Sequence, residues 1–205
     1  MFMDDFVVIA LFRHGITEEN KRKAYLGWND SPLCLEAGEI AISQTYQGYF
    51  SSDLPRCMAT ANILFPNSCP RYLQEFREMN FGMWEGKTYE DLKDEPMYQK
   101  WLSDPNRYCP PGGEFFWQFT KRVMKGWDRV IQYILSHNLS SCAIMTHGGV
   151  MRYLLSEFSP SAKEFWEWEV SYTLGYEFIF TKEALRRGGR CTLLQEVPLT
   201  VKGNG

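Results

Sequence analysis

Two histidines stand where buried strands are expected to end. The apolar run of residues 6–12 is followed by Arg13 and His14, and the apolar run of residues 142–146 is followed by His147. In open α/β sheets, ligands bind just outside the carboxyl ends of the strands. An imidazole at that edge can attack phosphorus, and an arginine beside it can hold phosphate oxygens with its planar fork. This spacing therefore predicts a site for phosphoryl chemistry.

Further residues complete the expected anion pocket. Arg56 follows Pro55 at another strand-to-helix junction. The backbone N–H groups that begin a helix near Gly148 favour an anion.

The elements that must position these residues alternate along the chain. Strands are expected at residues 6–12, 48–52, 71–73, 142–146, 175–180 and 192–197, and helices at 35–46, 55–64, 114–137 and 149–158. This alternation predicts an α/β fold, a three-layer sandwich with a mostly parallel central sheet flanked by helices. Because crossover connections are right-handed, His14 and His147 are expected at one edge of that sheet.

Length and composition limit the domain organisation and the partners. We expect one domain over residues 1–205, with a Pro-rich helical or irregular insertion at about 88–113 and a frayed tail from residue 199. A net charge of −3 predicts no general attraction to nucleic acid or to an anionic membrane. The chain shows neither a secretory signal pattern nor a run long enough to span a membrane. Six scattered cysteines without a CxxC pair indicate buried thiols, no zinc site and a cytoplasmic protein.

Five stretches resemble the motifs of the histidine phosphatase superfamily, also called the phosphoglycerate mutase-like family, in the order the family has them. They are LFRHGITEEN at 11–20, YLGWNDSPL at 25–33, SSDLPRCMATA at 51–61, REMNFGMWEG at 77–86 and MTHGGVMR at 145–152. One departure concerns the segment PPGGE at 110–114, after which small phosphatases of the family often carry serine. Phe115 stands at that position here, which makes it more apolar.

The resemblance implies a role for each matching residue. His14 would be the nucleophile that forms a phosphohistidine, and Glu78 would protonate the leaving oxygen and then activate water. The residues implied to bind the phosphoryl group or to lie near the substrate are Arg13, Arg56, His147, Asn20, Gly148, Arg22 and Glu85. Glu85 lies in the same loop as Glu78, residues 77–86, which we call the acid loop. Glu85 is expected mainly to order that loop. No metal and no cofactor are implied, since arginine and histidine neutralise the phosphoryl charge.

Some assignments stay open at this point. Arg22, Arg77 and Arg152 are either substrate contacts or solvated surface charges. Five aromatic residues, namely Trp28, Trp84, Phe115, Phe116 and Trp117, either line a pocket for the leaving group or belong to the core. His137 is expected to be structural, because it lies near the end of a helix.

The activity that the resemblance implies is a metal-independent phosphomonoesterase acting on a small phosphorylated metabolite. The form of residues 81–86 resembles the phosphatase branch of the family, which includes α-ribazole phosphatases. Two alternatives remain: a cofactor-dependent phosphoglycerate mutase, and a phosphate-binding regulatory protein without catalysis. A homodimer is left open.

Overall fold

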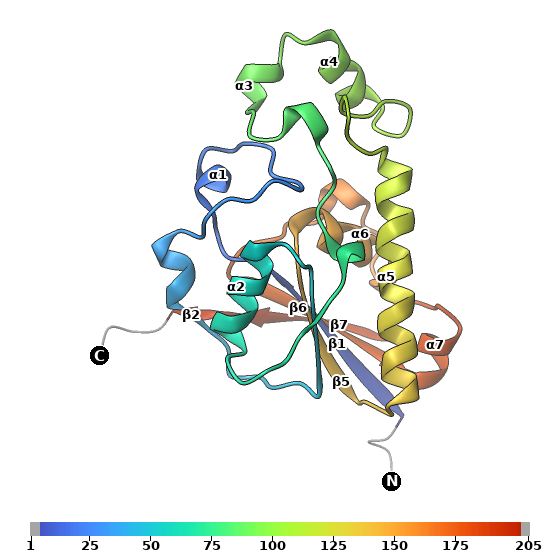
Figure 1. The fold of residues 1–205 in the computed structure, drawn as a ribbon. Helices are drawn as coiled ribbons and strands as arrows, with labels where there is room; N and C mark the ends of the chain where they lie inside the picture. Colours follow the sequence, from blue (N-terminus) through green and yellow to red (C-terminus); the bar gives the residue numbers. More distant parts are fainter. Residues whose placement is uncertain (1–4, 202–205) are drawn as a thin grey trace.

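The computed structural model describes residues 5–201, and a six-stranded sheet forms its centre in the order β4-β3-β5-β1-β6-β7 (Figure 1). The strands are β1 (Phe6–Arg13), β3 (Gly48–Ser51), β4 (Arg71–Tyr72), β5 (Ser141–Thr146), β6 (Leu174–Thr181) and β7 (Leu193–Pro198). Neighbours from β4 to β1 are parallel, whereas β6 runs antiparallel to both β1 and β7. Only β6 is reversed in this sheet, so the prediction of a mostly parallel sheet is confirmed.

Seven α-helices connect or flank the strands within the described residues. They are α1 (Glu18–Lys21), α2 (Pro55–Leu64), α3 (Tyr89–Leu92), α4 (Pro96–Ser103), α5 (Phe116–Ser136), α6 (Gly148–Phe158) and α7 (Lys182–Arg186). Short 3-10 turns lie at Leu35–Glu39, Gln74–Phe76, Gly82–Trp84 and Phe165–Glu167. Within residues 5–201, none of the helices has the length and apolar character needed to cross a bilayer.

The two faces of β1 belong to two hydrophobic cores. Val7, Ile9 and Leu11 pack in the larger core, which α5 and α6 cover. Ala10 and Phe12 pack in the smaller core with residues of α2. A strand buried on both faces is apolar without alternation, which explains the uniform run in the sequence. Helices therefore cover both faces of the sheet, as the three-layer prediction requires.

Residues 35–46 do not form the expected helix. A 3-10 turn covers Leu35–Glu39, and the chain then continues into β2 (Ile40–Ala41). β2 pairs antiparallel with β8 (Thr200–Val201), so a contact from the far end of the chain decides the local structure. The same pairing orders residues 200 and 201, and the Leu199 N–H donates to the Thr173 carbonyl, although the sequence predicts fraying from residue 199. Residues 202–205 lie outside the described residues.

The segment with α3 and α4 projects beyond the edge of the sheet at which β1 ends (green in Figure 1). An antiparallel bridge between Ala24 and Thr88 ties the start of the segment, and aromatic packing holds α4. Tyr98 and Trp101 of α4 are buried, and both rings contact Trp84 of the acid loop and Tyr25. This segment therefore forms a wall next to the loop that carries Glu78.

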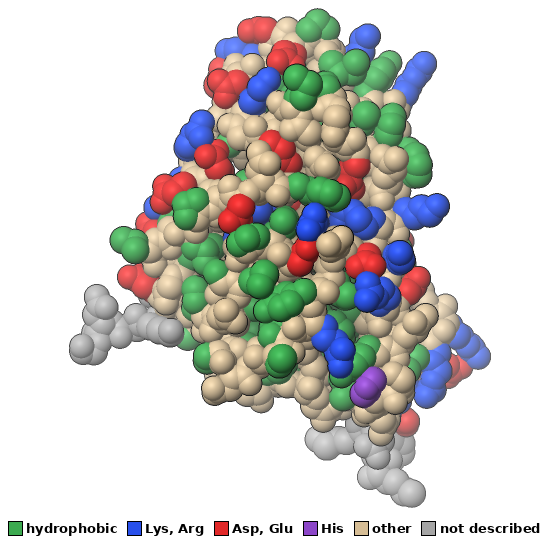
Figure 2. Space-filling view, in the orientation of Figure 1, with side chains coloured by type: hydrophobic (Ala, Val, Ile, Leu, Met, Phe, Trp, Pro, Cys, Tyr) green, Lys and Arg blue, Asp and Glu red, His purple; other side chains and the backbone are tan. Residues whose placement is uncertain are grey.

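Reactive side chains lie mostly inside the molecule. His14 and His147 are buried, whereas His137, which follows α5, is exposed. Histidine (purple) is visible near the lower edge of the surface in Figure 2. All six cysteines are free thiols. Four of them are buried, as expected, whereas Cys69 is exposed and Cys109 is half-buried.

Candidate active site

The two histidines meet at one edge of the sheet. β1 and β5 are parallel neighbours with Arg13 opposite Thr146, so the residues that follow each strand leave the sheet side by side. The backbone N–H of His14 continues the ladder by donating to the Thr146 carbonyl at 2.9 Å. The ring centroids of His14 and His147 lie 5.1 Å apart. The structure thus brings these two predicted site residues together.

His14 is held as a neutral imidazole with one available lone pair. Its Nδ1 lies 2.8 Å from the Gly15 carbonyl oxygen. A carbonyl oxygen only accepts hydrogen bonds, so Nδ1 carries the proton and Nε2 keeps its lone pair. Burial lowers the pKa of His14 well below its ordinary value, and the positive charges of Arg56 and Arg13 lower it further. These contacts produce the tautomer that a nucleophile requires.

Arg56 approaches the histidines from the first turn of α2. Pro55 occupies the N-terminal position of that helix, where its missing N–H costs nothing. The Arg56 side chain is buried, and its two terminal nitrogens donate to the Asn29 carbonyl at 2.8 Å and to the Gly27 carbonyl at 2.6 Å. The predicted inward fork is therefore present, and it also fixes the loop at residues 27–29.

Arg13 is fixed by a residue that the sequence reasoning missed. Its guanidinium stacks on the ring of Tyr172, 3.8 Å from the ring centroid, and donates to the Tyr172 hydroxyl at 2.8 Å. A second donor of the same group reaches the Val170 carbonyl at 2.8 Å. Tyr172 lies beyond the last recognisable motif, so no pattern in the sequence points to it.

Arg13 and Arg56 together form a site that suits an anion. Burial lowers the pKa of both guanidinium groups, and the carboxylate of Glu78 acts in the opposite direction on each. Among residues 5–201 the buried Nε of each arginine has no hydrogen-bond partner. Buried donors without acceptors are unfavourable by about 1–3 kcal/mol each. The positive charges of the two guanidinium groups beside His14 suit an anion.

His147 completes the group at the start of α6. Its Nε2 lies 2.9 Å from the Ser52 hydroxyl and 3.4 Å from the Cys57 sulfur. Burial lowers the pKa of His147 well below its ordinary value, and the charge of Arg56 adds to this effect. Gly148 follows, and a Cβ there would lie 3.3 Å from the Arg13 guanidinium carbon. A side chain at position 148 would therefore crowd Arg13.

Glu78 faces this group across the N-terminus of α6. One carboxylate oxygen accepts the Gly149 N–H at 2.8 Å, and the other accepts the Met79 N–H at 2.9 Å. A Cβ on Gly149 would overlap the Glu78 carboxylate, so glycine is required for this approach. The acid, two arginines and two imidazoles thus converge from four separate segments of the chain.

The model of the histidine phosphatase superfamily (branch 1) matches residues 9–186. This chain belongs to the histidine phosphatase superfamily. As the five motifs predicted, it is a hydrolase of the phosphoglycerate mutase family.

Known proteins that are similar to this histidine phosphatase support the same placement. The adenosylcobalamin/alpha-ribazole phosphatase of Salmonella typhimurium is 30% identical over 172 residues, which cover 78% of this chain and 84% of that protein. A phosphoglycerate mutase from Thermus thermophilus superposes with a TM-score of 0.67 at 27% identity, over 95% of this chain and all of that one. The alpha-ribazole phosphatase from Shigella flexneri shares the fold, with a TM-score of 0.77 at 22% identity over 96% of each chain.

Arg122 of α5 braces the acid loop of this histidine phosphatase. It donates to the backbone carbonyls of Arg77 at 2.9 Å and Glu78 at 3.1 Å, and to both carboxylate oxygens of Glu114 at 2.9 and 3.0 Å. Glu114 in turn accepts the Asn80 N–H. The sequence predicts a helix from residue 114, but α5 begins two residues later, and Glu114 pairs with Arg122.

Glu85 orders a loop, as expected, rather than offering its carboxylate to a ligand. Its two oxygens accept backbone N–H groups from Gly27, Trp28, Asn29 and Phe81 at 2.8 to 3.3 Å. These bonds join the acid loop to the loop that Arg56 also holds. Glu85 therefore holds these two loops together, and its expected place near the substrate stays a prediction.

Asn20 and Arg22 have local partners. The Asn20 side-chain oxygen accepts from the Thr17 hydroxyl and N–H, which closes a capping box at α1 and leaves its NH2 group as the donor that a substrate could use. Arg22 pairs with Glu19, and its side chain is 58% exposed. The structure therefore places Arg22 at the surface, in an ion pair with Glu19.

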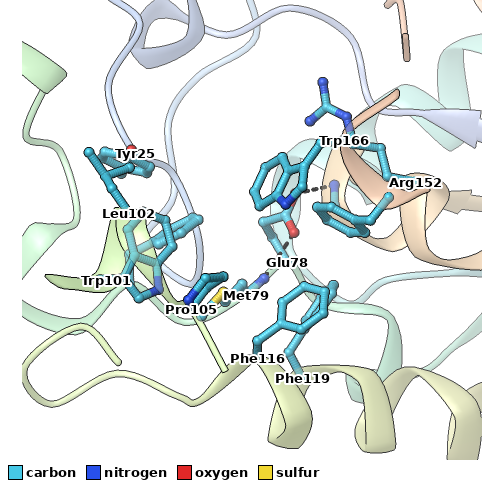
Figure 3. A pocket seen from close by; sticks show the side chains of 13 residues that line it. Tyr25, Glu78, Met79, Trp101, Leu102, Pro105, Phe116, Phe119, Arg152 and Trp166 are labelled. Carbon is cyan, nitrogen blue, oxygen red and sulfur yellow. Dashed lines mark hydrogen bonds between the residues drawn. The ribbon is translucent and has the colours of Figure 1, made fainter. Parts of the chain in front are cut away.

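A cavity of about 280 Å³ adjoins Glu78 (Figure 3). Phe116 lines it, whereas Trp84 belongs to the core and Trp28 and Trp117 line a separate cleft. Of the five aromatic residues considered for a leaving-group pocket, Phe116 alone takes that position. No cluster of three or more metal-ligating side chains occurs within residues 5–201.

Proposed function

We propose that this protein is a phosphomonoesterase that uses His14 as a nucleophile and acts on a small phosphorylated metabolite. The observation that carries the proposal is the neutral His14, whose Nδ1 is tied to the Gly15 carbonyl and whose ring feels the positive charges of Arg56 and Arg13. A lone pair alone makes a nucleophile, and a cationic pocket alone makes an anion site. Their combination is what transfer of a phosphoryl group requires.

The reaction has two steps in which every proton has an acceptor. In the first, Nε2 of His14 attacks phosphorus, the bond from phosphorus to the leaving oxygen breaks, and protonated Glu78 gives that oxygen its proton. In the second, Glu78 takes a proton from water as the water oxygen attacks phosphorus, and the phosphorus–nitrogen bond breaks. Inorganic phosphate leaves, and His14 and Glu78 return to their starting states.

Arg13, Arg56 and His147 are assigned to the phosphoryl oxygens. Charge on those oxygens is the main quantity that a protein stabilises in phosphoryl transfer. Arg13 and Arg56 are each held by two hydrogen bonds, so their orientation is set before a substrate arrives. We assign the NH2 group of Asn20 and the backbone at Gly148 as further donors.

A phosphatase assay tests the proposal directly. Release of inorganic phosphate from 4-nitrophenyl phosphate is expected between pH 5 and 8, unaffected by EDTA and inhibited by vanadate. His14→Ala is expected to abolish release while the far-UV spectrum stays native. Retained turnover in that variant would overturn the assignment of the nucleophile.

A phosphoglycerate mutase differs from a phosphatase in the molecule that accepts the phosphoryl group. A phosphoglycerate mutase returns the phosphoryl group to a sugar acid, so its activity depends on bisphosphoglycerate. We expect phosphate release to proceed equally with and without that compound. No turnover on a panel of sugar phosphates, nucleotides and aryl phosphates would favour a regulatory protein without catalysis.

A further inference from the structure

The cavity beside Glu78 has two aromatic walls. Figure 3 shows Tyr25, Trp101 and Leu102 on one side and Phe116 and Trp166 on the other, with Glu78 between them. Leu102 and Trp101 come from the segment that projects beyond the sheet, and Phe116 begins α5. A leaving group attached to an oxygen within reach of Glu78 would extend into this space.

Among the described residues, the cavity lining contains only two charged side chains, and one of them is the proposed acid. The other is Arg152, which lies one turn after Gly148 on α6. The hydroxyl of Tyr25 is engaged with Tyr98 at 2.7 Å, so it is not a free polar group of the wall. Arg152 is therefore the cation that this part of the chain places in an otherwise apolar space.

Arg152 also differs from other arginines of the molecule in its partners. Arg77, Arg122 and Arg129 each form an ion pair with a carboxylate. Arg152 donates from Nε to the Trp168 carbonyl at 3.0 Å, and no carboxylate of residues 5–201 pairs with it. Its Nε contact holds the side chain in place, while the outer edge of the guanidinium keeps its donors available. That edge is the part of an arginine that binds a carboxylate in a bidentate manner.

Trp166 supplies a second, independent observation. It belongs to the 3-10 turn Phe165–Glu167, lines the same cavity and is 66% exposed. A large aromatic side chain at a cavity rim offers contact area to a flat ligand at low entropic cost. An apolar ring that enters between the walls would cover Trp166.

We propose that the natural substrate is the phosphate ester of a flat, apolar alcohol that carries a second anionic group, and that Arg152 binds this group. The inference rests on the proposed function, since it places the leaving group on the Glu78 side of the phosphoryl site. Arg13, Arg56 and His147 hold the transferred phosphoryl group, and Arg152 selects among leaving groups.

Two matched substrates test this role. They are 2-naphthyl phosphate and 6-carboxy-2-naphthyl phosphate, which share a ring and differ by one carboxylate. Wild-type protein is expected to favour the carboxylated ester by about tenfold or more in kcat/KM, as a charge-assisted contact predicts. In Arg152→Gln the ratio of the two kcat/KM values is expected to fall to about one. The matched control is Arg129→Gln, an exposed arginine on α5 that should keep the wild-type ratio.

Trp166→Ala examines the apolar wall separately. This variant is expected to lower kcat/KM for both naphthyl esters relative to glycerol phosphate, with the preference for the carboxylate preserved. An equal loss for all three substrates in Arg152→Gln, with the ratio kept, would show that Arg152 holds the transferred phosphoryl group and would overturn the proposal.

Binding separates a failure of this proposal from a failure of the proposed function. Calorimetry with the His14→Ala protein measures the affinity for the two naphthyl esters without turnover. A preference for the carboxylated ester that disappears on adding Arg152→Gln supports the subsite even if wild-type protein hydrolyses neither ester. If the two esters bind with equal affinity to His14→Ala, with and without Arg152→Gln, the proposed subsite is wrong even if wild-type protein hydrolyses both esters fast.

Discussion

The phosphoryl site and the adjoining cavity are built in opposite ways. The phosphoryl site is polar and buried, and its histidines and arginines come from strand ends and helix starts, with His14 and His147 brought together by the register of β1 and β5. The cavity is apolar and is lined from α4, α5 and a 3-10 turn, with Trp166 largely exposed at its rim. The ends of strands and starts of helices thus bring the two histidines and two arginines together, whereas apolar side chains from separate segments form the adjoining cavity.

The difference explains what could be predicted from the sequence. Strand-end motifs have fixed spacing, so the convergence of His14, Arg56 and His147 could be predicted from the sequence. Residues 35–46 could not, because pairing with β8 at the other end of the chain overrides their helical pattern. Tyr172 likewise lies in a loop without a motif, and its contact with Arg13 depends on tertiary packing alone.

The cavity was the harder part to predict for the same reason. Aromatic residues occur in cores more often than in pockets, and spacing does not separate Trp84, which is buried in the core, from Phe116, which lines the cavity. Arg122 was missed because its partners are backbone carbonyls of a distant loop, which leave no trace in the sequence.

Glu78→Gln should have a large effect on the rate of hydrolysis. Glu78 lies between the phosphoryl site and the cavity, so the size of the effect should depend on the leaving group. Glutamine keeps the size of the side chain but cannot donate an acidic proton. Hydrolysis of alkyl phosphates, which are poor leaving groups, is expected to slow by about 100-fold to 10,000-fold, and hydrolysis of 4-nitrophenyl phosphate much less. Steady-state kinetics on both substrates check this, with Glu183→Gln on α7 as a surface control. Equal slowing of the two substrates would mean that Glu78 is not the acid.

Arg122→Lys should reproduce that leaving-group dependence more weakly. Lysine keeps the charge but cannot reach the loop carbonyls and Glu114 together, so Glu78 loses part of its support. We expect about a tenfold loss on alkyl phosphates and less on 4-nitrophenyl phosphate, in line with a misplaced catalytic group. Arg129→Lys on the same helix is the matched control. A loss that is uniform across leaving groups would indicate general destabilisation instead.

The buried imidazoles should make stability depend on pH. The pKa values of His14 and His147 are lowered in the folded protein, so the unfolded chain binds more protons as pH falls. Stability is therefore full above the ordinary histidine range and declines as pH drops toward the folded pKa values, by up to about 1.4 kcal/mol per pH unit for each histidine. Urea unfolding at pH 7.5 and 5.5 measures the change. His14→Gln should show a shallower decline, and an unchanged slope in that variant would argue against a neutral His14.

Phe115→Ser should have the smallest effect. Phe115 stacks on Trp117, and it does not line the cavity beside Glu78. Serine at this position, as small phosphatases of the family often have it, is expected to change kcat/KM for aryl phosphates by about twofold at most, as for other surface substitutions. A larger change would extend the substrate site toward the start of α5.

The central claim is that His14 carries the phosphoryl group during turnover. Rapid acid-free quenching of the protein with a ³²P-labelled substrate, followed by peptide mapping, tests it most directly. The account predicts an acid-labile, base-stable label on the peptide with His14 and no label in His14→Ala. A label on another residue, or turnover by His14→Ala without any label, would contradict it.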